Sequence, residues 1–310
     1  MRHTTTLVRL GVFLGALLLI PTTSTKAQTK SAGSGAVTFT VTAVGKKEEA
    51  PPISKDDVQL FQGKERKQIG DWKKDDNLFL AILIDDSLDS TAGGQWVYLK
   101  EFILGQPATT HISVGYIRNN GVALAQDFTT DHELAAKALR LPVGLGGIGS
   151  SPYLGTLDLL KRWPQTGPRR SILLISSGID YFRGGGFGVF SPDLDSVIQR
   201  AERQNTNVWS VYYPSSGHRG RAFYLVNNAQ SNLDKLSEDT GAESFFLGGG
   251  VPVSIKPYLD EIGIHLSNQY LLTFAGSGGA KGKYQSVKVK TELSGVEFFA
   301  PAAIFLPPGS

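Results

Sequence analysis

The sequence predicts an α/β protein with a doubly wound, mostly parallel sheet that is flanked by N- and C-terminal β segments. Three runs, LFLAILI (78–84), SILLISS (171–177) and NVWSVYY (207–213), are largely apolar along their length. Such runs are typical of central parallel strands that are buried on both faces. Segments with apolar residues at helical spacing lie between these runs, and strands that alternate with helices build a parallel sheet.

Apolar spacing and end signals place the helices. A helix is expected over about 96–104, where apolar residues recur at helical spacing and Gly105 follows as a stop signal. Residues 130–133 form a capping-box pattern with Thr130 as the expected cap of a short helix. Before it, two strands joined at Asn119-Asn120-Gly121 are expected to form a hairpin. Further helices are expected around 153–160, 192–201, 233–236 and 255–266.

Both ends of the chain carry β patterns. AVTFTVTAV (36–44) alternates between apolar residues and threonines, which predicts a half-buried strand. Two short strand-like runs surround Gly63, and QYLLTF, SVKVKTE and VEFFAPAAIF follow the last helix. Neither flank is long enough to bury a core alone, so we expect the two to pack together. The expected division is a β segment at 28–76, an α/β domain at 77–266 and a β segment at 267–310.

The N-terminus has the pattern of a secretory signal peptide. Arg2 and Arg9 precede an apolar run at 10–20, and a small-residue stretch ends at Ala27. The run is shorter than the roughly 20 residues that span a bilayer. We therefore expect cleavage after Ala27 and an exported protein, periplasmic or secreted, with no membrane span.

Charge and composition exclude several functions. Residues 1–27 hold three of the 31 basic side chains and no acid, so basic and acidic residues balance in the remainder. This balance gives no reason to expect nucleic acid as a partner. The absence of cysteine excludes disulfides and thiolate chemistry. No hydrolase elbow, phosphate-binding loop or H-E-x-x-H pattern occurs, so no enzyme is expected. The glycine pattern at 144–149 follows a helix and is interpreted as a loop, and His265 as a surface or boundary residue.

The stretch ILIDDSLDS (82–90) ends an apolar strand directly on Asp85, Asp86 and Asp89, with Ser87 and Ser90 between and after them. In an open parallel sheet, ligands bind outside the carboxyl ends of the strands. Carboxylate and hydroxyl oxygens are the ligands that a hard cation such as Mg²⁺ prefers. The loop is therefore a candidate cation site.

An apolar strand, this Asp-Asp-Ser-Leu-Asp loop and an amphipathic helix together resemble the first loop of the von Willebrand factor type A (VWA) domain, a Rossmann-like fold. The order of signal peptide, β segment, α/β core and β segment near QYLL also resembles the secreted VWA-related proteins of acidobacteria. This resemblance covers roughly residues 37–307. It implies binding rather than catalysis.

The resemblance also implies a metal-ion-dependent adhesion site that would take Mg²⁺ or Mn²⁺. Asp85 and Ser87 match the family pattern, whereas Asp89 stands in place of a second serine. In GSSPY, Ser151 replaces a threonine, and in ISSGID, Ser177 replaces an aspartate. The site is thus degenerate. The alternative is that Asp85, Ser87 and Asp89 only cap the turn and the following helix, without a metal.

The segment YFRGGGFGVF (181–190) leaves the same edge of the sheet as Asp85. Tyr181, Phe182, Arg183 and Phe187 are of the types that anchor protein interfaces. The alternative is that these aromatics fold beneath the loops as local core. The leading hypothesis is an exported protein-binding module, with an unidentified protein partner. The second is an envelope assembly or scaffold protein that binds through its β flanks and has a vestigial, metal-free site.

Overall fold

The computed structural model describes residues 35–45, 50–144, 150–164, 166–182, 192–215, 223–246, 250–276 and 278–308. The expected signal peptide, most of the 144–149 glycine pattern, Arg183 and Phe187 lie outside these residues. Within the described ranges, no helix has both the length and the apolar character that crossing a membrane requires.

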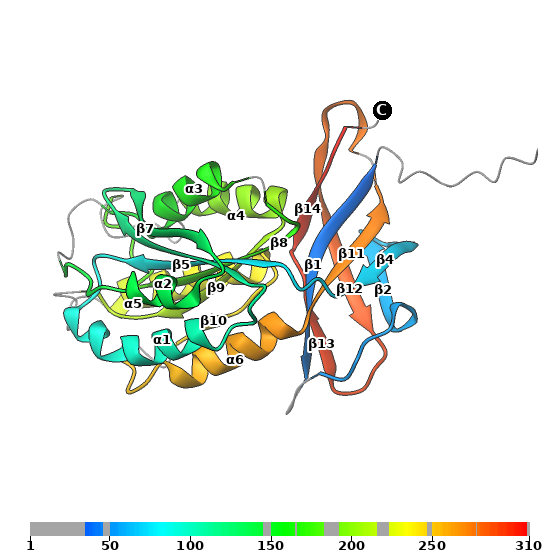
Figure 1. Ribbon diagram of the computed structural model, residues 1–310. Helices are drawn as coiled ribbons and strands as arrows, with labels where there is room; N and C mark the ends of the chain where they lie inside the picture. The colour runs from blue at the N-terminus through cyan, green and yellow to red at the C-terminus, as the bar shows by residue number, and fades with distance from the viewer. Residues whose placement is uncertain are drawn as a thin grey trace, which may run out of the picture. The chain divides into compact units, whose positions relative to one another are not determined.

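A six-stranded sheet forms the centre of the α/β unit (Figure 1). The strand order is β10-β9-β8-β5-β6-β7, and only the β6–β7 pairing is antiparallel. Numbered from the first strand of the sheet, this order is 3-2-1-4-5-6, the arrangement of a doubly wound fold. The predicted fold class is confirmed. The strands are β5 (Leu78–Asp85), β6 (His111–Arg118), β7 (Gly121–Thr129), β8 (Arg169–Ser176), β9 (Thr206–Tyr212) and β10 (Ser244–Phe245).

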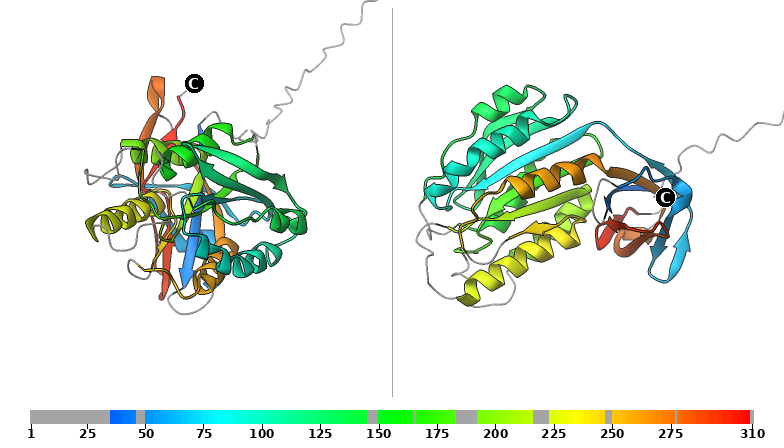
Figure 2. Two further views of the ribbon diagram at one scale, coloured as in Figure 1. Left: turned by 90° about the vertical axis from the view of Figure 1, so that its left-hand side faces the viewer. Right: turned by 90° about the horizontal axis from the view of Figure 1, so that it is seen from below.

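Helices cover both faces of this sheet (Figures 1 and 2). Successive residues of β5 face opposite sides, so that Ile82 and Ile84 join one apolar core and Ala81 and Leu83 join the other. The first core is covered by α1 (Trp96–Leu104), α2 (His132–Lys137) and α6 (Lys256–Ser267). The second is covered by α3 (Pro152–Arg162), α4 (Pro192–Gln204) and α5 (Phe223–Asp239).

Helix α2 begins one residue later than the capping-box pattern indicates. Its cap is Asp131, whose carboxylate accepts from the Leu134 N–H at 2.9 Å. The prediction that Thr130 is the cap is wrong. An ionised aspartate is a strong acceptor for helix N–H groups, and the Thr129 hydroxyl accepts from the Asp131 N–H at 3.0 Å.

The two β flanks form two four-stranded antiparallel sheets, ordered β13-β1-β11-β4 and β14-β12-β2-β3. Each sheet contains strands from both ends of the chain, as the neighbouring blue and red strands of Figure 2 show. The expectation that the flanks pack together is confirmed, and they share one apolar core. The strands are β1 (Ala36–Gly45), β2 (Val58–Gln62), β3 (Glu65–Lys67), β4 (Ile69–Lys73), β11 (Gln269–Ala275), β12 (Lys283–Thr291), β13 (Val296–Phe299) and β14 (Ala303–Leu306). Short 3₁₀ helices are η1 (Lys55–Asp57), η2 (Ser90–Gln95) and η3 (Gly279–Lys281).

Strand β1 is buried on both faces, which corrects the half-buried interpretation. Thr40 and Thr42 are each 0% exposed, although they form the polar face of the strand. The strand contacts the α/β unit through its backbone: the Thr40 N–H donates to Asn205 Oδ1 at 2.7 Å, and the Ala43 N–H donates to the Asn268 carbonyl at 3.0 Å. Alternation shows only which residues share a face, not whether a second layer covers it.

Arg169 connects the α/β unit to the β flanks. Its guanidinium donates to Gln269 Oε1 at 3.0 Å, to the Asp75 carbonyl at 2.7 Å and to the Leu266 carbonyl. Burial lowers the pKa of Arg169 to about 10. The three acceptors lie just before β5 and at the junction of α6 and β11, where the chain passes between the α/β unit and the flanks.

Candidate functional site

The carboxyl ends of the central strands bring the predicted residues to one edge of the sheet. Strand β5 ends at Asp85, β8 at Ser176 and β9 at Tyr212. Ile84 pairs with Ile175, and Ser176 pairs with Tyr212, so these strands end at the same level. The loops after them therefore start side by side.

Asp85 is 2% exposed and accepts two hydrogen bonds. The Ser87 N–H donates to Oδ1 at 2.9 Å, and the Ser176 hydroxyl donates to Oδ2 at 2.8 Å. Burial raises the pKa of Asp85, while these hydrogen bonds act in the opposite direction. The hydroxyl from the β8 loop that reaches Asp85 is thus Ser176 and not Ser177. The resemblance to the VWA pattern pointed to Ser177 in this loop. It missed Ser176 because Ser176 lies one position earlier than the residue that the pattern uses.

A cavity of about 160 Å³ lies beside this loop, lined by Asp86, Ser87, Ile117, Arg118, Asn119, Val143 and Ser150. The hydroxyl oxygens of Ser87 and Ser150 are both buried, and neither has a hydrogen-bond partner among the described residues. A buried polar atom without a partner is unfavourable, so these two hydroxyls have unused hydrogen-bonding capacity beside the cavity.

The other three predicted ligands accept hydrogen bonds from nearby backbone groups. Asp89 caps η2 and accepts from the Thr91 N–H at 2.9 Å and from its hydroxyl at 2.8 Å. Ser151 caps α3 by accepting from the Leu154 N–H at 3.3 Å. The Ser177 hydroxyl accepts from the Ile179 N–H at 3.4 Å.

The loops that carry Ser151 and Ser177 lie next to each other. The Tyr153 hydroxyl donates to the Gly178 carbonyl at 2.7 Å, and the Tyr181 N–H donates to the Ser150 carbonyl at 3.0 Å. On the other side, the Asp89 N–H donates to the Pro214 carbonyl at 3.2 Å. The structure therefore places all five residues on one edge, with Asp85 and Ser87 in direct contact.

Asp86 has a different role from its neighbour Asp85. It is 5% exposed and pairs with both terminal nitrogens of Arg140, at 2.6 and 2.8 Å. The Val143 N–H also donates to its carboxylate at 3.2 Å. Asp86 raises the pKa of Arg140, whose guanidinium lies 3.7 Å from the centre of the Tyr116 ring. No motif of fixed spacing joins these residues, so the pair could not be predicted from the sequence.

The two aromatic residues that the structure describes after β8, Tyr181 and Phe182, differ in exposure. The Tyr181 hydroxyl hydrogen-bonds Ser215 Oγ at 2.5 Å, and burial raises the pKa of Tyr181. Phe182, by contrast, is 48% exposed. The alternative of local core thus applies to Tyr181, whereas Phe182 faces the solvent.

Exposed apolar side chains gather around the same edge. Of the fourteen large hydrophobic residues that are exposed in the described ranges, eight lie on the segments that follow the carboxyl ends of the strands, six on loops and two at the start of α5. We call these eight the carboxyl-edge surface. The segment after β10 is tied to it through Gln95, which donates to the Val253 carbonyl at 3.3 Å. The residues of the carboxyl-edge surface are Leu141, Val143, Phe182, Phe223, Tyr224, Phe246, Val251 and Val253.

No protein-family model matches the chain, and no curated protein sequence matches it. Solved structures with similar folds include an aerotolerance-related membrane protein from Bacteroides fragilis NCTC 9343, at 10% identity, 61% coverage of this chain, 98% of that chain and a TM-score of 0.46. The SpRpn10 VWA domain is 12% identical, and the match covers 59% of this chain and 94% of that chain with a TM-score of 0.40. The human COPII-coat protein Sec24c is 7% identical, and the match covers 92% of this chain and 48% of that chain with a TM-score of 0.42. Because these TM-scores are all below 0.5, the assignment of the mixed α/β fold is based on the strand pairing within this chain.

Proposed function

We propose that this chain is an exported protein-binding module whose partner contacts the carboxyl-edge surface, beside a degenerate adhesion-type site at Asp85 and Ser87. The gathering of exposed apolar residues around one edge of the sheet carries this proposal. Exposed apolar patches at a functional edge mark sites of protein association, and aromatic residues dominate the affinity of such interfaces. Phe182, Phe223 and Tyr224 are 48%, 80% and 50% exposed there. On this proposal the chain binds and does not catalyse.

The residues of the edge fit a hard cation such as Mg²⁺ or Mn²⁺. Asp85 supplies a buried carboxylate, and the Ser87 hydroxyl has no hydrogen-bond partner among the described residues. The hydroxyls of Ser151 and Ser177 each accept one N–H and keep a second lone pair for another contact. When bound, the ion would offer a positive charge to an acidic group of the partner.

The metal-free alternative has support as well. Asp89 and Ser151 are the caps of η2 and α3, which is the role that the alternative assigns to such residues. Dependence on the cation separates the two alternatives. If chelation abolishes partner binding, the adhesion-type site is in use; if binding is indifferent to chelator, the site is vestigial.

The test uses the chain without residues 1–27, immobilised as bait for an exported-protein fraction from the source cells. We expect Phe182→Ser combined with Phe223→Ser to weaken capture at least thirtyfold without changing the melting temperature, since interface anchors are worth 2 kcal/mol or more. The matched control is Ser286→Ala with Lys288→Ala, two exposed positions on β12. Capture that survives the aromatic pair of changes contradicts the proposed surface.

The scaffold alternative is favoured by a different observation. A cavity of about 540 Å³ lies in the β flanks, lined by Lys55, Asp56, Val58, Arg66, Lys67, Gln68 and Ile69. Strand β3 beside it is an edge strand, which leaves backbone groups free to pair with another chain. If the β12 control loses the partner and the aromatic variant keeps it, the β flanks make the contact.

A further inference from the structure

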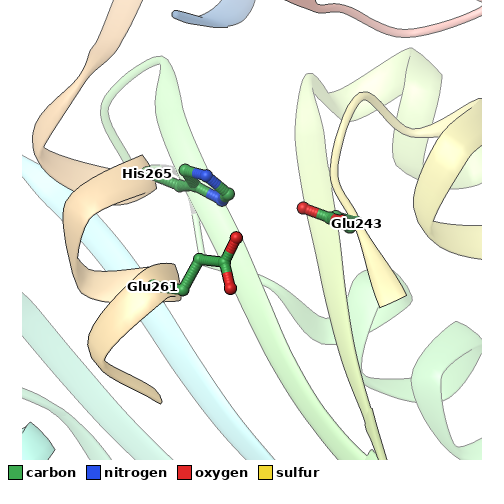
Figure 3. A group of neighbouring side chains, drawn as sticks. All are labelled: Glu243, Glu261 and His265. Carbon is green, nitrogen blue, oxygen red and sulfur yellow. The ribbon is translucent and has the colours of Figure 1, made fainter. Parts of the chain in front are cut away.

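Three side chains with metal-binding groups meet at the opposite side of the sheet from β7. Glu243, Glu261 and His265 each offer one ligand atom, and these atoms all lie within 4.8 Å of one another. Figure 3 shows the two carboxylates directed toward the imidazole ring. Glu261 and His265 are four positions apart on α6, so they share one helical face. Glu243 directly precedes β10, the edge strand, with β9 and β8 between it and β5.

His265 is buried and lacks a partner. It is 3% exposed, and its Nδ1 has no hydrogen-bond partner among the described residues. The ring packs between Trp209, at 5.3 Å between ring centres, and Phe299, at 5.7 Å. The interpretation of His265 as a surface or boundary residue is therefore wrong, because β9 and the β flanks enclose the last turns of α6. A buried imidazole nitrogen without a partner is unfavourable unless something binds it.

The charges around the cluster also lack compensation. None of the ion pairs found among the described residues includes Glu243 or Glu261. Glu243 and Glu261 are thus two neighbouring carboxylates without a cationic partner among the described residues, and a bound divalent cation would balance their charge.

We propose that Glu243, Glu261 and His265 form a zinc site that ties α6 to the β9–β10 edge of the sheet. One imidazole and two carboxylates suit Zn²⁺, whereas Mg²⁺ and Ca²⁺ prefer sites made of oxygen alone. Three protein ligands leave the fourth tetrahedral position open to water or to a group from a partner. The site is separate from the carboxyl-edge surface and does not depend on the function proposed for it.

The geometry allows such a site with a small movement. Bonds of about 2.0–2.2 Å to a tetrahedral ion place ligand atoms roughly 3.3–3.6 Å apart. The present separations of up to 4.8 Å are wider than this. Glu261 is exposed, so rotation of its side chain can bring its carboxylate closer, while His265 is held in place by its aromatic neighbours.

The test is calorimetric titration of ZnCl₂ into the chain lacking residues 1–27, purified without a histidine tag and freed of metal by chelator. We expect one Zn²⁺ per chain, and a loss of affinity of at least tenfold in Glu261→Gln and in Glu243→Gln. The matched control is Asp260→Asn, which neighbours Glu261 on α6 but pairs with Lys256 at 2.7 Å. It should bind Zn²⁺ as the unmutated protein does.

Two results would overturn the proposal. One is the absence of Zn²⁺ binding by the unmutated protein at micromolar concentrations. The other is stoichiometric binding that persists in the Glu243→Gln/Glu261→Gln double variant, because the ion would then be bound at a different site. Circular dichroism of each variant checks that the fold is retained. Substitution by Co²⁺ adds a spectral check, since the intensity of its visible absorption distinguishes a tetrahedral site from an octahedral one.

Discussion

Arg140 holds Asp86 through a two-pronged ion pair, with nitrogen–oxygen distances of 2.6 and 2.8 Å. The pair joins the loop after β5 to the segment after α2. Val143 and Gly144, in the same segment, strengthen this link because their backbone N–H groups also donate to Asp86. Asp86 is 5% exposed and the Arg140 side chain is 42% exposed. The two adjacent aspartates thus have different roles. Asp86 holds one wall of the cavity that it lines with Ser87 and Ser150, and Asp85 accepts hydrogen bonds from Ser87 and Ser176.

Loss of Arg140 should destabilise the protein by about 2 kcal/mol. Arg140→Met leaves the Asp86 carboxylate buried without its counter-charge. The free-energy cost should lie between that of breaking an exposed ion pair and that of breaking a fully buried one. Urea unfolding measures the change. The double variant Arg140→Met/Asp86→Asn should recover part of the loss, and a single variant as stable as the unmutated protein would show that the pair contributes nothing.

Millimolar Mg²⁺ or Mn²⁺ should raise the melting temperature, because a ligand that binds only the folded state stabilises it by about 2.7 kcal/mol at a hundred times its Kd. Asp85→Ala and Asp89→Ala should each abolish the rise. The exposed Asp127→Ala serves as a control and should keep it. Under the metal-free alternative, cation has no effect on any variant, and Asp89→Ala loses only a cap worth about 1 kcal/mol.

Arg169→Ala should lower the free energy of unfolding by roughly 2–4 kcal/mol, because it removes three hydrogen bonds from a buried junction. We also expect the transition to broaden as the β flanks and the α/β unit lose their coupling. Tryptophan fluorescence during urea unfolding reports both. Lys161→Ala, at an exposed position on α3, should leave the curve unchanged.

Glu202 should make the protein less stable as pH rises through about 7. Burial raises the pKa of Glu202 to about 7, and its carboxylate accepts from the Ala303 N–H at 3.2 Å. The folded state then binds more protons than the unfolded state above the ordinary glutamate pKa, so stability falls with increasing pH. Glu202→Gln should flatten the slope of melting temperature between pH 5 and 8. An unchanged slope would show that Glu202 titrates normally.

The exported protein should begin at Gln28, since Ala27 ends the small-residue stretch after the apolar run. Intact-mass measurement of protein recovered outside the cytoplasm decides this. A mass that retains residues 1–27 in the recovered protein contradicts the expected cleavage.

The sequence predicted those features that depend on local periodicity. The buried strands and the amphipathic helices follow from spacing within ten to twenty residues, and the mostly parallel α/β class follows from their alternation. The sequence did not predict features that depend on packing between distant segments. Examples are the burial of Thr40 against the α/β unit, the choice of Ser176 rather than Ser177 as the partner of Asp85, and the enclosure of His265. The four-residue spacing of Glu261 and His265 was visible, but only the fold adds Glu243 to them.

The pairing of β1 with β11 dictates an order of assembly. Thr38 on β1 bonds Thr273 on β11, a residue 235 positions later in the chain. During synthesis, β1 emerges first and must wait, unpaired, until nearly the entire polypeptide has been made. Closure of so long a loop is slow, while the α/β unit between them can form from nearer contacts. A chain that stops before β11 therefore leaves the backbone N–H and C=O groups of β1 unpaired along both edges, which is a template for aggregation.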